Sequence, residues 1–286
     1  MNSDVIQTLW THGPLSVMER LSLSSFLKTG HEVHLYSYEE IAGIPNGVIL
    51  KDAREIIPEK LYDYRTFINN GTFADFFRYR LLLDKGGWWV DTDLVALKRF
   101  EFCDPYVFGC MGPYPYLEPA PPVKRGLRRP PRAVVEQQKL WWPNAWVSNN
   151  CMKSPAGSDV MKHAWNMCLQ YDPAKVKWSE EVGPKLIDAA VRRYGLHEYV
   201  RNTKYFNPIA PEHVRRMVDP EEKWEFSADT YAIHLWNDMW SGRTNWEDKH
   251  TWQITGCPPL LQNKECAVKG SLYGCLIENY LGAIDE

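Results

Sequence analysis

The chain has 286 residues, of which 44% are hydrophobic and 24% are charged, and its formal net charge at pH 7 is -3. This length and composition fit one large α/β domain, or one domain with an insertion, and supply ample material for an apolar core. The near-neutral charge argues against nucleic acid or an anionic membrane as the main partner, because neither phosphate backbones nor acidic lipids would be strongly attracted.

The seven cysteines include no Cys-x-x-Cys pair, so the spacing of a zinc site is absent. A disulfide framework is not expected in a chain of this length, and we expect reduced thiols. No signal peptide follows Met1, and no window is long and apolar enough to span a bilayer. We therefore expect a cytoplasmic protein without a transmembrane segment. Peripheral contact with a membrane is compatible with this expectation.

The N-terminal region has the pattern of a strand, a helix and a second strand. Val5–Leu9 predicts the first strand, and Pro14 suits the first turn of a helix that extends to about Lys28. Glu32–Tyr36 predicts the second strand. This order is the start of a nucleotide-binding α/β half, but no glycine-rich fingerprint follows the first strand. A nucleotide held here would need base stacking and a metal instead.

Two aromatic residues near the ends of these strands are candidates for binding the base. Trp10 directly follows the first strand, and Tyr36 ends the second, so both could line one pocket. The alternative for Trp10 is an anchoring role in the core, which is the role we expect for most of the 13 tryptophans.

The stretch 73–98 is the part around which the rest of the chain is organised. Apolar side chains recur at helical spacing from Phe73 to Leu83, and polar residues form the opposite face. Gly86 and Gly87 stop this helix, because glycine readily adopts the left-handed conformation of a helix end. The apolar run Trp88–Val90 then suits a strand that is buried on both faces.

The predicted strand leads into two acidic residues, Asp91 and Asp93. Carboxylates at positions i and i+2 of an extended backbone point to the same side, and open α/β sheets bind ligands at the carboxyl ends of their strands. Acidic oxygens in this arrangement suit Mn²⁺ or Mg²⁺ that also holds a diphosphate. The alternative is that both are turn residues at the surface.

Residues 74–93, ADFFRYRLLLDKGGWWVDTD, resemble the signature of the DXD-containing sugar transferases. This group includes yeast initiating mannosyltransferases, animal α-1,4-galactosyl- and N-acetylglucosaminyltransferases, and the catalytic domain of the large clostridial glucosylating toxins. The shared pattern is an Asp, an Arg-Tyr pair, a Leu, two glycines and D-x-D. The resemblance implies a single α/β domain of GT-A (Rossmann-like) type over residues 1–286, with a mixed central sheet flanked by helices and a proline-rich loop insertion.

The same resemblance implies a glycosyltransferase that uses a nucleotide-sugar donor and Mn²⁺ or Mg²⁺. UDP is favoured, because Trp10 is similar to a tryptophan that packs on uracil in the toxin domains. Similarity to α-forming enzymes implies retention of configuration. The acceptor would be a glycan, a lipid-linked sugar or a protein, in the synthesis of polysaccharides or glycoconjugates.

Roles for the residues of the motif follow from this hypothesis. Asp93 would ligate the metal directly, and Asp91 would reach it through water or hold hydroxyls of the ribose and sugar. Asp75 and Arg78 lie one turn apart on one helical face, where they could grip the donor sugar. Asp91, Asp93 and Arg78 are therefore the catalytic candidates.

The segment 112–142 differs in composition from the rest of the chain. It contains seven prolines and a cluster of basic residues, namely Pro113, Pro115, Pro119, Pro121, Pro122, Pro130 and Pro131 with Lys124, Arg125, Arg128, Arg129 and Arg132. A stretch so rich in proline is neither regular helix nor central strand, and we expect a long loop or lid on the acceptor side. The basic side chains could meet an anionic acceptor or could be solvated surface.

Further along, Val147–Met152 predicts a strand that contains the amides of Asn149 and Asn150. In the sugar transferases a similar segment borders the sugar site, and amides can hydrogen-bond to hydroxyls without adding charge. An Asx-turn is the alternative. Helices are expected at 157–170, 181–193 and 271–281.

A late strand, Tyr231–Ile233, enters His234, Trp236 and Asn237. A histidine at a strand end is more often a core residue than a ligand. However, this string resembles the C-terminal motif with which GT-A transferases complete the metal shell. We expect His234 to be the third metal ligand, with Asn237 as its substitute, and Trp236 to cap the diphosphate.

Two other functions remain open. Phosphatases of the haloacid-dehalogenase type also carry a nucleophile in a strand-D-x-D, but here Leu94 follows Asp93 in place of their Gly-Thr. A sugar-binding protein without activity on the same fold is the second alternative, and the intact acidic motif argues against it.

Overall fold

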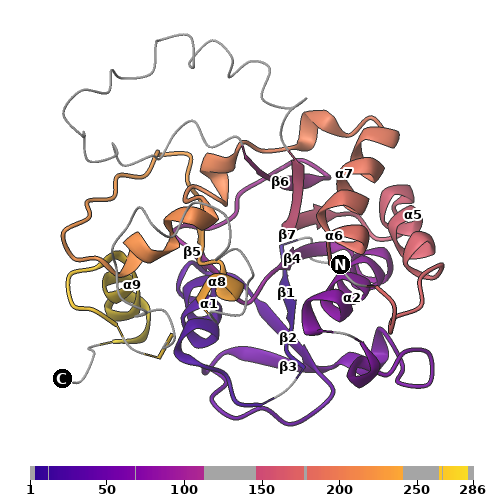
Figure 1. Ribbon diagram of the computed structural model, residues 1–286, viewed down its shortest axis with the longest axis horizontal. Helices are drawn as coiled ribbons and strands as arrows, with labels where there is room; N and C mark the ends of the chain where they lie inside the picture. The colour runs from indigo at the N-terminus through magenta and orange to yellow at the C-terminus, as the bar shows by residue number, and fades with distance from the viewer. Residues whose placement is uncertain are drawn as a thin grey trace.

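The computed structural model describes residues 4–11, 13–67, 69–112, 146–176, 179–240, 264–265 and 267–282. Its centre is a mixed six-stranded sheet with the strand order β3-β2-β1-β4-β7-β6 (Figure 1). The strands are β1 (Ile6–Leu9), β2 (Val33–Ser37), β3 (Val48–Asp52), β4 (Gly87–Val90), β6 (Val107–Met111) and β7 (Trp146–Ser154).

Strands β3, β2, β1 and β4 are parallel neighbours, whereas β7 runs antiparallel to both β4 and β6. Ile6 of β1 lies opposite Val33 of β2 and Trp88 of β4. Because parallel strands present their carboxyl ends at one edge, the loop after β1 and the turn after β4 open at the same edge of the sheet.

Helices cover both faces of this sheet. Figure 1 shows one group on one side, namely α2 (Asn70–Asp84), α5 (Asp159–Cys168), α6 (Ser179–Val182) and α7 (Pro184–Arg193). The other side carries α1 (Val17–Lys28), α8 (Asn237–Trp240) and α9 (Leu272–Leu281). Short 3-10 helices lie at Ala53–Glu55, Tyr64–Thr66, His197–Tyr199, Thr203–Tyr205 and Pro211–Val218. Within the described part of the chain, no helix is both long and apolar enough to cross a bilayer.

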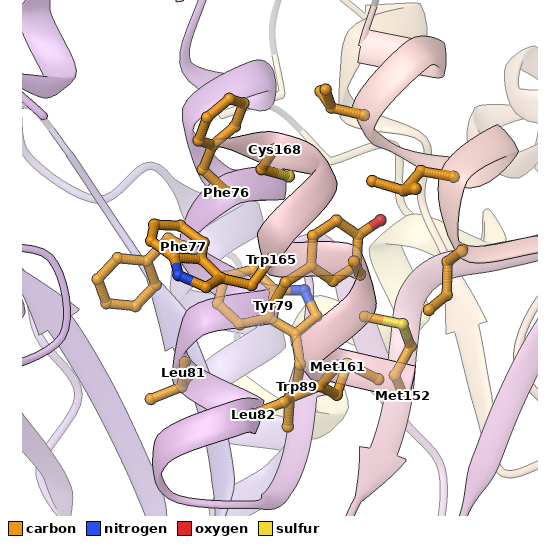
Figure 2. Close-up of a cluster of buried hydrophobic side chains, with 14 of the residues drawn as sticks. Phe76, Phe77, Tyr79, Leu81, Leu82, Trp89, Met152, Met161, Trp165 and Cys168 are labelled. Atoms are coloured by element: carbon orange, nitrogen blue, oxygen red, sulfur yellow. The ribbon is translucent and has the colours of Figure 1, made fainter. Parts of the chain in front are cut away.

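The two tryptophans of β4 serve two separate cores. Trp88 packs with the α1 side of the sheet and Trp89 with the α2 side, and both are at most 1% exposed. Figure 2 shows the α2 side, where Phe76 and Phe77 of α2 lie near Trp165 of α5 and Trp89. Burying each such ring stabilises the fold by about 1.5–3 kcal/mol. The predicted strand with two buried faces is confirmed.

A separate two-stranded antiparallel sheet joins β5 (Leu94–Ala96) to β8 (Ala232–His234). Two hydrogen bonds connect this sheet to α1. Ser22 Oγ donates to the carbonyl of Leu94 at 2.6 Å, and the amide of Ala96 donates to Ser25 Oγ at 2.8 Å. The strand β5 begins directly after the acidic motif, so this small sheet fixes the position of the motif.

The predicted α/β class, with a mixed sheet between helices, is confirmed and is consistent with the GT-A arrangement. Two boundaries were predicted wrongly. The first helix begins at Val17 instead of Pro14, since Glu19 reaches back to accept from the amide of Ser16 at 2.7 Å. The helix expected at 181–193 is divided into α6 and α7, because Pro184 cannot donate an amide hydrogen bond. Apart from Gly112, the expected loop 112–142 lies outside the described residues.

Candidate metal and donor site

The acidic motif forms a tight turn between β4 and β5. The amide of Leu94 donates to the carbonyl of Asp91 at 3.2 Å, and the amide of Asp91 donates to the carbonyl of Asn150 at 2.8 Å. The expectation of an extended backbone at Asp91 and Asp93 is therefore wrong. The two carboxylates converge because the chain reverses direction here. The hydrogen bond to Asn150 of β7 holds this turn at the carboxyl edge of the sheet.

Three candidate ligands meet at this turn. Oxygens of Asp91 and Asp93 and a ring nitrogen of His234 all lie within 4.8 Å of one another. His234 Nε2 is 3.2 Å from Asp93 Oδ2. The side chains of Asp93 and His234 are 12% and 9% exposed, whereas the Asp91 side chain is 27% exposed and forms the most accessible part of the cluster.

The charges within the cluster are unequal. Burial acts to raise the pKa of Asp93, but His234 and the backbone amide of Asn237 outweigh it and hold that pKa below its usual range. Burial raises the pKa of Asp91, although the guanidinium of Arg78 opposes this. Burial acts to lower the pKa of His234, and the Asp93 carboxylate raises it overall. Asp93 is thus the carboxylate that stays ionised most readily.

This donor set fits a divalent cation. Two carboxylates and one imidazole are ligands that Mn²⁺ accepts. In addition, His234 Nδ1 is buried and has no hydrogen-bond partner among the described residues. Asp91, Asp93 and His234 are therefore the residues that could hold a metal ion.

Arg78 connects the acidic turn to helix α2. Its guanidinium lies 3.1 Å from Asp91 Oδ1 and 3.2 Å from Asp75 Oδ1, and it donates to the carbonyl of Asn149 at 2.6 Å. Its Nε donates to the carbonyl of Ala74 at 3.1 Å. Arg78 is only 4% exposed, and its guanidinium is hydrogen-bonded to these protein groups. This environment favours a role in positioning other residues over direct contact with a sugar.

Asp75 is the buried end of this network. Its Oδ1 accepts from Asn149 Nδ2 at 2.7 Å, while its Oδ2 has no partner among the described residues. Burial raises the pKa of Asp75 to about 7, reinforced by Asp91 and opposed by Arg78. Near neutral pH this carboxyl can therefore both accept and donate a hydrogen bond.

The two amides of β7 point to different surroundings. Asn149 faces Asp75, and Asn150 donates through Nδ2 to Asn207 Oδ1 at 2.7 Å on the other side of the strand. Side chains alternate along a strand, so only one of the two neighbours can join the cluster. The structure brings Asn149 to the candidate site and places Asn150 in a structural network.

Trp236 and Asn237 form the C-terminal border. The indole of Trp236 lies 4.1 Å from the His234 ring, and its backbone has a φ of 57°, a left-handed value that is uncommon outside glycine. The chain turns there, so that the amide of Asn237 donates to Asp93 Oδ2 at 2.8 Å. The Asn237 side-chain oxygen accepts from Lys264 at 3.2 Å.

The two predicted base-binding residues lie in different surroundings. Trp10 is half-buried at the carboxyl end of β1, where its Nε1 donates to the carbonyl of Gly13 at 3.0 Å. Tyr36 is 3% exposed, and its ring packs 5.6 Å from Phe77 in the α2-side core. The site geometry thus places Trp10, but not the ring of Tyr36, at the same edge as the acidic turn.

The sequence reasoning missed two residues of this site. Trp89 Nε1 donates to Asp91 Oδ1 at 2.8 Å, and the i, i+2 spacing of these residues was a readable signal. Lys264 lies beside Asn237 and forms an ion pair with Glu19. No pattern in the sequence connects Lys264 to the acidic motif, because the contact depends on how the C-terminal part folds back.

Comparisons with solved structures include two distant likenesses to transferases. No family model matches the chain, and no curated protein does. The structure is similar to the solved PaToxG glycosyltransferase, with a TM-score of 0.44 and 14% identity over 67% of this chain and 69% of that one. It is also similar to a cysteine-to-serine mutant of a transferase, with a TM-score of 0.35 and 8% identity over 69% of this chain and 86% of that one. Likenesses this distant do not assign an activity.

Proposed function

We propose that the chain is a metal-dependent glycosyltransferase. It would move a sugar from a nucleotide-sugar, with UDP-sugars favoured, to a hydroxyl of a glycan, a lipid-linked sugar or a protein. The observation that carries the proposal is the convergence of Asp91, Asp93 and His234 at the carboxyl edge of the sheet. This is the edge at which open α/β sheets bind their ligands.

Asp93 and His234, with Asp91, would hold Mn²⁺ or Mg²⁺, which supplies positive charge for the nucleoside diphosphate that departs. The protein prepares these ligands in advance. Arg78 and Trp89 both bind Asp91 Oδ1, and the amide of Asn237 binds Asp93 Oδ2. Because each carboxylate has one oxygen fixed, little reorganisation is needed when the donor binds.

Asp75 and Asn149 are the groups that would contact hydroxyls of the donor sugar. Asp75 Oδ2, which has no hydrogen-bond partner in the part of the chain that the structure describes, supports this role, since a buried carboxyl oxygen without a hydrogen bond is costly unless a ligand uses it. Arg78 would act through Asp75 and Asp91, which its guanidinium holds on either side. It is therefore a positioning residue in this proposal.

The half-buried indole of Trp10 would stack on the base. UDP is favoured through the resemblance of Trp10 to the tryptophan that packs on uracil in the toxin domains. Trp236 would lie over the donor from the side of His234, against whose ring it packs. Retention of configuration, with an α-linkage as product, is part of the proposal through the resemblance of the acidic motif to α-forming enzymes.

The test is a panel of nucleotide-sugars, assayed for release of free nucleotide with and without Mn²⁺. We expect hydrolysis of a UDP-sugar that requires Mn²⁺, and loss of that activity in Asp93→Asn. The matched control is Asp84→Asn, because Asp84 belongs to the same motif but pairs with Arg80 at 2.7 Å outside the cluster.

Each alternative function gives a different result in this assay. Release of phosphate from small phosphomonoesters, unaffected by UDP, would identify a phosphatase. Binding without release of nucleotide under any condition would identify a sugar-binding protein. Equal turnover by Asp93→Asn and the wild type would remove Asp93 from the reaction.

A further inference from the structure

Lys264 lies between the candidate base-stacking residue and the candidate metal ligands. Its ammonium is 5.8 Å from the centroid of the Trp10 ring and donates to Asn237 Oδ1 at 3.2 Å. The amide of the same Asn237 binds Asp93 Oδ2. Asn237 is therefore in contact with both the Lys264 ammonium and the acidic turn.

The backbone at Lys264 is held in place by its surroundings. Tyr273 of α9 donates through its hydroxyl to the carbonyl of Lys264 at 2.6 Å. The adjacent Glu265 accepts from the amide of Val17 at the start of α1, at 3.1 Å. Because both anchors lie on helices packed against each other, the side chain of Lys264 is directed at the carboxyl edge by the fold.

The partner of Lys264 is an unusual carboxylate. The Glu19 side chain is 0% exposed, and its second oxygen accepts from the amide of Ser16. The Lys264 side chain is 26% exposed, and its ammonium is paired with this fully buried carboxylate. An ammonium has three donors, and Glu19 and Asn237 are the two acceptors that it reaches among the described residues.

The third N–H of the Lys264 ammonium could serve the proposed nucleotide-sugar. Asp91 and Asp93 would hold a divalent cation from the protein side, so the phosphate oxygens that do not bind that cation need a charged hydrogen-bond donor from the protein. Arg78 cannot supply it, since its guanidinium is bound to Asp91, Asp75 and backbone carbonyls. Lys264 retains one N–H without an acceptor among the described residues, and it lies on the side of Trp10.

We propose that Lys264 binds the diphosphate of the nucleotide donor, as a point of positive charge between the base and the metal site. This assignment rests on the proposed function. The third ammonium donor would bind a non-bridging phosphate oxygen, and the contacts to Glu19 and Asn237 would hold the ammonium in position.

The test must not leave the buried Glu19 carboxylate unpaired, because such a variant would lose stability for a reason unrelated to the donor. We therefore compare Glu19→Gln with the double variant Glu19→Gln/Lys264→Met. Glutamine at this position can keep the cap of α1. Binding of UDP, GDP and inorganic pyrophosphate in the presence of Mn²⁺ would be measured by calorimetry, and binding of Mn²⁺ alone by electron paramagnetic resonance.

We expect the double variant to bind UDP and pyrophosphate about tenfold or more weakly than Glu19→Gln, because charge-assisted hydrogen bonds have this effect. Binding of Mn²⁺ alone should be unchanged, and Glu19→Gln/Lys264→Arg should bind within about threefold of Glu19→Gln. The matched control is Lys28→Met, since Lys28 also ties α1 to α9, through the carbonyl of Asn279 at 2.8 Å, but lies outside the site.

The outcomes separate this assignment from the proposed function. If the wild type binds neither nucleotide with Mn²⁺, the proposed function is wrong, and the assignment of Lys264 is overturned with it. If the wild type binds UDP or GDP and the double variant binds equally well, only the role of Lys264 is overturned. A parallel loss of Mn²⁺ binding or of thermal stability in the double variant relative to Glu19→Gln would show a structural role and would also overturn the assignment.

Discussion

Leu94 and His234 are paired across the small antiparallel sheet, and this pairing brings the two ends of the site together. The residue before Leu94 is Asp93, whose carbonyl accepts from the amide of Leu235 at 2.9 Å. Residues separated by 141 positions in the sequence thus become neighbours through the backbone alone. The strand pairing therefore places the imidazole of His234 3.2 Å from the Asp93 carboxylate.

His234→Ala should weaken Mn²⁺ binding by about tenfold or more, because losing even an outer-shell partner of a metal ligand costs 10–100-fold. Titration of Mn²⁺ by electron paramagnetic resonance measures this directly. The control is His34→Ala, since His34 also pairs with a carboxylate, Glu32 at 2.7 Å, but lies on β2 away from the acidic turn. Equal Mn²⁺ affinity of the two variants would exclude His234 as a ligand.

Arg78→Met should destabilise the fold by about 3–5 kcal/mol, because it leaves the Asp75 and Asp91 carboxylates without their buried counter-ion. Arg80→Met on the same helix should cost no more than about 1 kcal/mol, since its pair with Asp84 is partly exposed. Urea unfolding monitored by circular dichroism gives both values. Similar losses in the two variants would show that Arg78 is not the centre of the network.

The sequence was most informative where glycine, proline and long apolar runs mark the elements. Gly86 and Gly87 located the end of α2, and the apolar run after them located β4. The strand β5 was not predicted, because three residues carry too little periodicity. Because β5 begins at Leu94, the chain forms a tight turn at Asp91, where we expected an extended segment.

The candidate site was readable only in part for a related reason. Asp75, Arg78, Asp91 and Asp93 lie in one stretch, whose local spacing shows how they can meet. Lys264 reaches this group through contacts of α9 with α1, which no local pattern encodes. Tertiary packing decides such contacts, and a single sequence does not display it.

His31 should make the fold sensitive to acid. Its Nε2 accepts from the amide of Phe100 at 2.9 Å, and burial, assisted by Arg99, lowers the pKa of this histidine below 6.5. The unfolded chain then binds a proton that the folded chain excludes. Stability should therefore fall as pH decreases from 6.5 toward the lowered pKa, by at most about 1.4 kcal/mol per pH unit for this one group.

The measurement is urea unfolding of the wild type and His31→Gln between pH 7.5 and pH 5, each as a series. Glutamine has no comparable titration, so we expect the variant to lose less stability than the wild type over this range, from a lower starting value. His197→Gln is the control, because His197 is exposed on the surface. Parallel curves for the wild type and His31→Gln would contradict the prediction.

Asp75→Asn should separate stability from activity. The folded-state pKa of Asp75 is raised to about 7, mainly by burial, so ionising this carboxyl destabilises the fold as pH rises from its ordinary value of 3.8 through 7. An amide of the same shape avoids that cost and keeps an oxygen to accept from Asn149. We expect Asp75→Asn to be as stable as the wild type or more stable at pH 8, with a smaller difference at pH 5.

Hydrolysis of the nucleotide-sugar should nevertheless fall by about tenfold or more in this variant, because the carboxylate proposed to bind the donor is lost. Both properties are measured on one preparation, by urea unfolding at pH 5 and pH 8 and by Mn²⁺-dependent release of nucleotide. A destabilised Asp75→Asn at pH 8 would contradict the burial argument. Full activity would instead show that the donor does not depend on Asp75, even though the network through Arg78 surrounds it.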